Sequence, residues 1–438
     1  MKIITRFPPS PTGYFHIGSA RTALFNYLFA AREGGEMKLR FEDTDITRSK
    51  KEFEEDILAG LDWLGIPYTP ASPLRQSERT DTYRAHLKTL LESDAAFEAE
   101  PSTADPNTPV IRFKNPKKAV TFTDLVRGEV TFDTTDLDDF VIAKNLDEPL
   151  YHLAVVIDDH DTGVTHVIRG EDHISNTPRQ ILLLEALGFS RPQYAHIPLI
   201  LAPDRSKLSK RHGAVSVNEY RKEGFIPEAL VNYLALLGWN PGTEQEIFSL
   251  EELADAFRIE QVQKGGAIFD ADKLRWFNAR HLSRLSDDEY ARRLADTFHC
   301  EPPAASIPLL KERSHTLLEA AKLVDGGEFS FLDKEISYDS SLLLSGAKTD
   351  AETARRHLAR VGEMLDDIPA DSFDSEHVKD SVFTYATEEG RGAVLWPLRV
   401  ALSGRERSPD PFTIAGMRGR ERTLERIRRA DTRLKSDI

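Results

Sequence analysis

Hydrophobic residues near the amino terminus follow two spacings that predict a strand, a helix and a second strand. Residues 2 to 7 form a short apolar run, and a turn rich in proline follows from Pro8 to Gly13. The next apolar side chains recur every three or four residues, which predicts a helix that ends before Gly34 and Gly35; they are Ala20, Leu24, Phe25, Leu28 and Phe29. Met37 to Phe41 predicts the second strand, so the opening indicates a parallel sheet.

Short strand-like segments replace this pattern between residues 86 and 148 and indicate an inserted subdomain. They are Val110 to Phe113, Val120 to Phe122 and Val130 to Phe132. Apolar runs typical of buried parallel strands then return; they are Leu153 to Ile157, Val164 to Ile168 and Ile197 to Leu201, with a helix expected around Ile181 to Leu187. Helical spacing dominates from about residue 216 onward. The chain therefore combines a parallel α/β sheet with a helical carboxyl-terminal region.

Composition limits the class of protein. A chain of 438 residues with 40% hydrophobic and 29% charged residues is typical of a globular protein with roughly two to four folded units. No apolar run approaches membrane-spanning length, and the start of the chain does not resemble a signal peptide, so we expect a cytoplasmic protein without a membrane partner. The single cysteine, Cys300, excludes an intrachain disulfide and a thiolate-rich zinc site.

Charge alone does not decide whether the chain binds nucleic acid. The formal net charge of -15 argues against it, because neutralising phosphates drives such binding. The end of the chain is nevertheless basic; its cations are Arg418, Arg420, Arg422, Arg426, Arg428, Arg429, Arg433 and Lys435. The alternative interpretation is a solvated helix in which Glu425 and Arg429 pair one turn apart.

Unusual polar residues follow the predicted strands. The carboxyl ends of parallel strands share one crevice, where ligands bind. His16 stands at the mouth of the first helix with Gly18 behind it, and free amide groups there favour a phosphate. A histidine before a helix is more often only a cap. A basic loop with Lys207 and Lys210 supports the phosphate interpretation, because both lysines can turn toward a triphosphate.

These segments resemble known signatures. His16-Ile17-Gly18-Ser19 and Lys207-Leu208-Ser209-Lys210-Arg211 are similar to the HIGH and KMSKS motifs of class I aminoacyl-tRNA synthetases. Four further segments resemble the glutamyl-tRNA synthetases of the bacterial type; they are Arg6 to Gly13, Leu39 to Asp45, Val167 to His173 and Trp396 to Gly404. The similarity covers nearly the whole chain and is weakest in the insert and between residues 300 and 380.

The resemblance implies a class I synthetase fold. Its core is a Rossmann-like parallel sheet with an inserted α+β subdomain that binds the acceptor end, and its carboxyl-terminal anticodon-binding region is all helical. The expected boundaries are residues 1–85 and 149–203 for the two halves of the catalytic domain, 86–148 for the insert, 204–305 for the KMSKS loop and stem-contact helices, and 306–438 for the anticodon-binding region.

The resemblance also implies residue roles in binding glutamate. Arg6 and Arg169 would face its two carboxylates, for which a bidentate guanidinium is suited. Glu42 would hold the α-ammonium group, and Ser10 and Tyr151 would add hydroxyl hydrogen bonds. Each residue taken alone is equally consistent with a structural ion pair or a cap.

The remaining roles concern ATP and tRNA. His16, Lys207 and Lys210 would be catalytic through contacts to the phosphates. The ATP-binding residues would be His16, Gly18, Ser19, Glu171, Leu208 and Lys210, with Mg²⁺ accompanying ATP. Arg399, Arg418 and Arg422 are candidate contacts to tRNA. We expect a monomer that acts on tRNA(Glu), and the sequence leaves open whether tRNA(Gln) is also a substrate.

The sequence departs from the family pattern in two places. The insert holds no cysteine, so we expect no zinc. Ser19 replaces the last histidine of the HIGH motif, as is ordinary for glutamate-specific members. A glutaminyl-tRNA synthetase shares both signatures, although a neutral amide would not require a second arginine. A short paralogue that glutamylates a tRNA base would lack the carboxyl-terminal half, which this chain has. A catalytically inactive tRNA-binding relative need not keep the phosphate and glutamate residues together, and a nucleotidyltransferase with another acceptor would not explain the long helical region.

Overall fold

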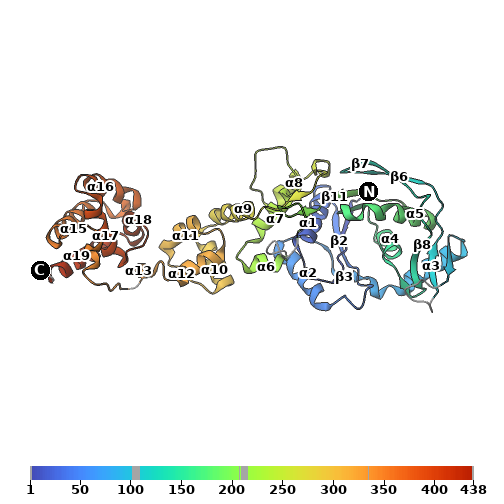
Figure 1. Ribbon diagram of the computed structural model, residues 1–438, viewed down its shortest axis with the longest axis horizontal. Coiled ribbons are helices and arrows are strands. Elements are labelled where there is room, and N and C mark those ends of the chain that lie inside the picture. The colour runs from blue at the N-terminus through green and yellow to red at the C-terminus, as the bar shows by residue number, and fades with distance from the viewer. Residues whose placement is uncertain (1, 101–108, 207, 209–215, 334, 437–438) are drawn as a thin grey trace. The chain divides into compact units, whose positions relative to one another are not determined.

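The computed structural model describes residues 2–100, 109–206, 208, 216–333 and 335–436 (Figure 1). The chain divides into two compact units, Met1–His281 and Leu282–Ile438. The first contains both α-helices and β-sheets, whereas the regular elements described in the second are all helical. Among the described residues, no helix is both long enough and apolar enough to cross a membrane.

The first unit begins with the predicted strand, helix and strand. β1 (Ile4–Phe7), β2 (Glu36–Phe41) and β3 (Thr69–Arg75) are parallel neighbours in that order. α1 (Ile17–Arg32) connects β1 to β2, and α2 (Lys51–Leu64) connects β2 to β3. Gly34 permits the turn after α1 because its φ is +64°, and at Gly35 a Cβ would lie 2.1 Å from the carbonyl oxygen of Ile3.

A second parallel pair of strands lies beside β1. β10 (His166–Gly170) and β11 (Gln193–Ile197) pair in parallel, with α5 (Thr177–Leu187) between them as predicted. The backbone N–H of Thr165, just before β10, donates to the carbonyl oxygen of Ile4 over 2.9 Å. β10 therefore lies beside β1, and the carboxyl ends of the parallel strands face the same side.

The prediction of a strand at Leu153 to Ile157 is wrong. These residues lie in α4 (Tyr151–Asp161), and every side chain of the run is at most 2% exposed. A helix that is buried on all sides carries an uninterrupted apolar run, which has no periodicity to distinguish it from a buried strand. The run Ile197 to Leu201 is likewise divided between the end of β11 and the short strand β12 (Ile200–Leu201).

The insert contains the predicted strands in two sheets. β4 (Ala96–Ala99), β5 (Val110–Phe113), β8 (Phe140–Asn145) and β9 (Glu148–Pro149) form an antiparallel sheet. β6 (Ala119–Asp124) and β7 (Gly128–Asp133) form a hairpin that pairs with β11 through Tyr194 and Asp124. α3 (Thr80–Glu92) precedes these strands. The hairpin thus extends the sheet of β10 and β11.

Helices follow after residue 216, as predicted. In the first unit they are α6 (Val217–Lys222), α7 (Pro227–Leu236), α8 (Leu250–Ala256) and α9 (Ala271–Arg284), with the short strand β13 (Ala267–Ile268) beside β12. The second unit begins at Leu282, within the last turn of α9. It contains α10 (Asp287–Phe298), α11 (Ile307–Arg313), α12 (Leu317–Asp325), α13 (Ser330–Asp333), α14 (Leu342–Ser345), α15 (Ala351–Asp366), α16 (Ser375–Glu388), α17 (Arg391–Ser403), α18 (Pro411–Arg418) and α19 (Arg420–Ser436).

Candidate active site

Four of the five residues predicted to bind glutamate lie close together. Arg6 is on β1, Arg169 is on β10, Glu42 directly follows β2, and Tyr151 begins α4. The charges of Arg169, Glu42 and Arg6 all act on the Tyr151 hydroxyl, whose pKa burial raises. Ser10 lies exposed in the turn after β1. The carboxyl ends of the parallel strands and the start of α4 have brought the first four side chains together.

A buried ion-pair network holds two of these side chains, Arg6 and Glu42, in place. Arg40 is only 3% exposed and contacts Asp159 over 2.5 Å and Glu42 over 3.1 Å. Arg6 is 2% exposed, and its Nε lies 3.3 Å from Asp159 Oδ1. Asp159 therefore bridges the two arginines, and Arg40 holds the carboxylate of Glu42.

Asp159 and Glu42 respond differently to the same environment. Burial raises the pKa of Glu42 more than Arg40 and Arg6 lower it. Burial also acts to raise the pKa of Asp159, but Arg40 and Arg6 together hold that pKa below its usual value. Asp159 is consequently the permanent counter-ion of the two arginines, whereas Glu42 would gain from a further cation, such as an ammonium group.

Sequence reasoning did not assign roles to Arg40, Asp158 or Asp159. Asp158 is fully buried and accepts hydrogen bonds from Gln76 over 2.7 Å, Arg79 over 2.8 Å and Tyr83 over 2.9 Å. The doublet Asp158-Asp159 at the end of an apolar run was a usable signal. Because the run was interpreted as a strand, in which adjacent side chains point to opposite faces, the doublet did not indicate a joint role for the two carboxylates.

Arg169 has only neutral partners. Its Nε donates to His196 Nε2 over 3.2 Å, and its Nη2 donates to Thr177 Oγ1 over 2.9 Å. Its Nη1 is buried and has no hydrogen-bond partner in the described structure. Burial lowers the pKa of Arg169, and the nearby charge of Arg6 lowers it further. A buried guanidinium with an open donor is suited to an anionic ligand that completes its pairing.

Tyr151 occupies the first turn of α4 at the edge of the same crevice. Its hydroxyl lies 3.1 Å from His173 Nδ1. Burial lowers the pKa of His173, and Arg169 and Arg6 add to that effect, which favours the neutral imidazole. The Tyr151 hydroxyl is thus oriented by a neutral ring and can still serve a ligand.

The candidate phosphate site is at the amino end of α1. His16 is the N-cap: its Nδ1 accepts from the backbone N–H of Ser19 over 3.2 Å, and its Nε2 lies 3.0 Å from Ser19 Oγ. A Cβ at Gly18 would lie 3.1 Å from His16 Nδ1, so a larger residue there would displace the imidazole by a few tenths of an ångström. The exposed His16 ring and the positive end of a helix together favour a phosphate.

The segment after the basic loop returns to His16. His16 forms an isolated antiparallel bridge with Ser216, and the N–H of Val217 donates to the carbonyl oxygen of Phe15 over 2.8 Å. Leu208 is half-buried against the core of the first unit. Lys207 and Lys210 lie outside the described residues, so their predicted roles stay predictions.

Glu171 is engaged by protein groups. Its Oε1 accepts from the backbone N–H of Leu199 over 2.9 Å, and its Oε2 pairs with Arg127. Arg127 also contacts the carbonyl oxygen of Lys264 over 3.3 Å. A structural ion pair is therefore present at Glu171, and a ribose hydroxyl would have to share this carboxylate with Arg127.

Comparisons with known proteins match both units. The catalytic domain of the class I tRNA synthetases for E and Q matches residues 2–105 and 98–276, and an anticodon-binding domain matches residues 271–431. A glutamate–tRNA ligase from Nitratidesulfovibrio vulgaris is 41% identical, covering 98% of this chain and 99% of the relative. One from Carboxydothermus hydrogenoformans is 39% identical, covering 96% and 98%.

The chain belongs to the glutamate–tRNA ligase family.

Solved structures agree with this membership. A glutamate–tRNA ligase from Elizabethkingia meningosepticum, crystallised in complex with its amino acid, superposes with a TM-score of 0.81 at 31% identity. The alignment covers 99% of this chain and 100% of that one. A second structure, from Elizabethkingia anophelis, gives a TM-score of 0.80 at the same identity. The expected class I fold with a helical anticodon-binding domain is confirmed.

The arginines of the ligase's anticodon-binding domain divide into two groups. Arg418 donates to the carbonyl oxygen of Leu332 over 3.3 Å and also contacts that of Phe331. Arg426 is 7% exposed and donates to the carbonyl oxygen of Leu402 over 2.7 Å. These two arginines hold α18 and α19 against the rest of the domain.

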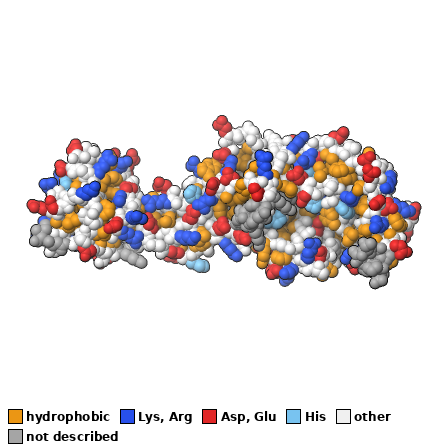
Figure 2. All heavy atoms as spheres, viewed as in Figure 1, with side chains coloured by type: hydrophobic (Ala, Val, Ile, Leu, Met, Phe, Trp, Pro, Cys, Tyr) orange, Lys and Arg blue, Asp and Glu red, His pale blue; other side chains and the backbone are white. Residues whose placement is uncertain are grey.

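The second group faces outward. Arg422 and Arg428 are exposed on α19, and Arg399 is half-buried on α17. The predicted pair of Glu425 with Arg429 is confirmed at 2.7 Å. On the face drawn in Figure 2, positive and negative side chains are intermixed. Of the three candidate contacts to tRNA, Arg422 is consequently the one whose side chain is most open to a phosphate.

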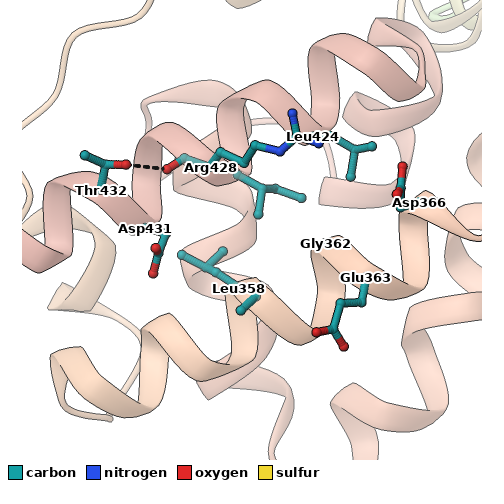
Figure 3. Close-up of a pocket in the computed structure, with 10 residues that line it drawn as sticks. Leu358, Gly362, Glu363, Asp366, Leu424, Arg428, Asp431 and Thr432 are labelled. Carbon is teal, nitrogen blue, oxygen red and sulfur yellow. Dashed lines mark hydrogen bonds between the residues drawn. The ribbon is translucent and has the colours of Figure 1, made fainter.

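A pocket of approximately 390 Å³ lies between α15 and α19 (Figure 3). Its lining includes three carboxylates, Glu363, Asp366 and Asp431, and one arginine, Arg428. Ion pairs hold its walls, with Arg355 2.8 Å from Asp431. Arg360 pairs with Glu363 over 2.9 Å and Arg420 with Asp366 over 2.7 Å, so each of the three carboxylates has an arginine partner, and the lining itself indicates no ligand.

Proposed function

We propose that the crevice at the carboxyl ends of β1, β2 and β10 activates L-glutamate with ATP for transfer to the 3′ end of tRNA(Glu). Membership in the glutamate–tRNA ligases gives the reaction. The observation that carries the assignment of the site is the buried Nη1 of Arg169, which has no hydrogen-bond partner in the described structure. The charges of Arg169, Arg6 and Glu42 all act on Tyr151, which places the four side chains in one neighbourhood.

In this proposal each side chain binds one part of glutamate. Arg169 pairs with one carboxylate through its open Nη1, and Arg6 interacts with the other. Glu42 accepts the α-ammonium group, which offsets the cost of burying its own charge. Tyr151 and Ser10 add hydrogen bonds from their hydroxyls. Support for Ser10 comes only from its place in the turn directly after β1.

The nucleotide would lie across the amino end of α1. His16, held by Ser19, contacts the phosphates, and Gly18 permits their close approach to the backbone. Lys207 and Lys210 would counter the charge that builds up on the leaving pyrophosphate, with Leu208 as a packing contact to ATP. Glu171 would bind the ribose by sharing its carboxylate with Arg127.

Positioning and charge stabilisation are sufficient for the chemistry. The α-carboxylate of glutamate attacks the α-phosphorus of ATP, which gives glutamyl-adenylate and pyrophosphate. The terminal ribose hydroxyl of the tRNA then takes the glutamyl group and releases AMP. Neither step forms a bond to the protein, so the chain contributes orientation and fixed charges.

Cofactors and partners follow from the same reaction. Mg²⁺ would enter as the counter-ion of ATP and needs no protein cage. Among the described residues, no group of three or more His, Cys, Asp or Glu side chains could hold a metal ion; an enzyme without zinc remains a prediction. The insert would receive the acceptor end of tRNA, and exposed Arg422 would contact the anticodon arm. Of the other two candidates, Arg399 is half-buried, and Arg418 is held by carbonyl oxygens of its own domain. A cytoplasmic monomer is expected.

One assay tests the reaction. ATP/pyrophosphate exchange is measured with purified tRNA(Glu) present, once with glutamate and once with glutamine, and charging is then measured on tRNA(Glu) and tRNA(Gln). We expect exchange with glutamate and charging of tRNA(Glu). Exchange that prefers glutamine would contradict the proposal. Charging of tRNA(Gln) with glutamate would extend the range of tRNA substrates.

A further inference from the structure

We propose that Asp124 and His196 are positioning residues for glutamate binding, because they form a buried relay that orients the guanidinium of Arg169. Neither residue belongs to a motif that the sequence reveals. The inference rests on the proposed pairing of Arg169 with a glutamate carboxylate. It makes part of the insert, through Asp124 on β6, a component of the amino-acid site.

The hydrogen bonds of the Asp124 carboxylate fix the protonation state of His196. Both side chains are fully buried, and His196 Nδ1 lies 2.6 Å from Asp124 Oδ2. The backbone N–H groups of Val126 and Arg127 donate to Asp124 Oδ1 over 3.0 and 2.9 Å. The N–H of His196 itself also donates to Asp124. A carboxylate with this many donors stays ionised and acts only as an acceptor, so Nδ1 of the ring must carry the hydrogen.

This tautomer determines whether the ring nitrogen of His196 that faces Arg169 is a donor or an acceptor. With the hydrogen on Nδ1, the Nε2 of neutral His196 is an acceptor, and it faces Arg169 Nε at 3.2 Å. Thr177 Oγ1 accepts from Arg169 Nη2 over 2.9 Å and lies 3.1 Å from the same Nε2. Two of the three guanidinium nitrogens are thus fixed by neutral acceptors, and the plane of the group directs Nη1 as the open donor.

The relay connects two segments that are distant in the sequence. Asp124 ends β6 in the inserted hairpin, and His196 is near the end of β11, the strand with which that hairpin pairs. Arg169 is on β10, the next strand in the sheet. The position of the guanidinium therefore depends on the insert being docked against the catalytic sheet.

Protonation of His196 would disrupt the relay. It would place an N–H on Nε2 against the N–H of Arg169 and add a second positive charge beside it. The groups that act on His196 are Asp124 from β6, Arg127 from the following turn, Arg169 from β10, Thr177 from α5 and His173 from the segment between them, with Tyr194 beside it on β11. Burial and Arg169 lower the pKa of His196 more than Asp124 raises it. Glutamate binding is accordingly retained at neutral pH and weakens only in acid.

The test uses three histidine variants and measures KM for glutamate and kcat against pH in tRNA-dependent ATP/pyrophosphate exchange. His196→Leu removes the acceptor and should raise KM at least about tenfold at neutral pH, with a smaller change in kcat. His196→Gln supplies an amide oxygen that does not titrate, so KM should stay within a few-fold of the wild type and its rise in acid should disappear. His166→Gln is the matched control: His166 is buried on β10, contacts Thr165 over 2.8 Å, and should leave both parameters and the acid rise unchanged.

Asp124→Asn tests the tautomer without changing the shape of the site. The two N–H groups at the Oδ1 position require the amide oxygen there, so the amide NH₂ must face His196 Nδ1 and force the hydrogen onto Nε2. We expect a rise in KM similar to that of His196→Leu, in protein whose melting curve shows that it is folded. Asp124→Asn with the KM of the wild type would overturn the proposal, as would His196→Gln that keeps the acid rise or has the KM of His196→Leu.

Arg169→Lys separates this inference from the proposed function. If Arg169→Lys and His196→Leu both raise KM for glutamate, the relay and the site are supported together. If only Arg169→Lys raises it, the relay is wrong and the site stands. If Arg169→Lys leaves KM unchanged, the assignment of the glutamate site itself fails, and the relay fails with it.

Discussion

Removal of the Asp159 carboxylate should destabilise the first unit, although no motif in the sequence includes this residue. Asp159→Ala takes away the shared counter-ion of Arg6 and Arg40, which are 2% and 3% exposed. Removing one partner of a buried ion pair costs about 3–5 kcal/mol, because a buried charge is left uncompensated. Arg40 keeps Glu42 at 3.1 Å, so we expect the lower end, about 3 kcal/mol.

That loss corresponds to a measurable shift in melting temperature. For a unit of this size, 1 kcal/mol lowers Tm by roughly 2–4 °C, so Asp159→Ala should lower the Tm of the first unit by about 6–12 °C. The control is Asp161→Ala on the same helix. Asp161 pairs with Arg79 near the surface, its side chain is 31% exposed, and such a pair contributes at most about 1 kcal/mol. Differential scanning calorimetry of both variants measures the contrast.

The lowered pKa of Asp159 predicts how its contribution to stability changes with pH. The pKa of Asp159 is lowered in the folded protein, so its stabilising contribution is fully present above the ordinary aspartate value of about 3.9 and is lost as the pH falls through the folded value. The difference in Tm between Asp159→Ala and the wild type should stay constant from pH 7 to about pH 5. A shift no larger than that of Asp161→Ala, or a difference that vanishes by about pH 6, would refute the reasoning.

Three further outcomes test the phosphate site and the basic helix. Gly18→Ala would push the His16 ring by a few tenths of an ångström and should lower kcat about tenfold in pyrophosphate exchange. Gly13→Ala is the control, because its Cβ would meet nothing within 4 Å, and it should leave kcat unchanged. Equal effects of the two variants would contradict the role of His16. Arg422→Ala should raise KM for tRNA and reduce the slope of log K against log salt by about 1, and an unchanged slope would remove it as a phosphate contact. Arg426→Ala should instead destabilise the second unit in a urea titration, because it removes buried hydrogen bonds; a variant as stable as the wild type would show that these bonds contribute little.

The sequence predicted those parts of the fold in which periodicity and position carry the information. The three- and four-residue spacing predicted α1, and the isolated apolar segments predicted β5, β6 and β7. Arg6 and Arg169 could be placed in one crevice from the sequence alone, because residues at the carboxyl ends of parallel strands share an edge. Local pattern and sheet geometry were sufficient there.

Local pattern failed where a contact depends on the third dimension. α4 is buried on every side, so its sequence shows no helical period, and the inward direction of Asp158 and Asp159 could not be inferred. Asp124 and His196 are 72 positions apart and meet only because a hairpin of the insert pairs with β11. Charged residues that hold ligand-binding side chains in place follow no sequence motif of their own, so only the packing of the folded chain identifies them.

In the proposed glutamate site, the neutral partners of Arg169 favour a carboxylate ligand over an amide. Asp159 compensates Arg6 and Arg40, but Arg169 is held by an imidazole and a hydroxyl and forms no ion pair with a carboxylate among the described residues. A glutamine amide oxygen at Nη1 would accept a hydrogen bond from the ionised guanidinium, but only a glutamate carboxylate would also form an ion pair with it. That added attraction favours glutamate over glutamine at this contact. Because the preference arises from the absence of an internal carboxylate partner, supplying such a partner should abolish it. Thr177→Asp would pair with Arg169 Nη2 at the place of the present hydroxyl and should reduce the ratio of kcat/KM for glutamate over glutamine. An unchanged ratio would show that other residues discriminate between the two amino acids.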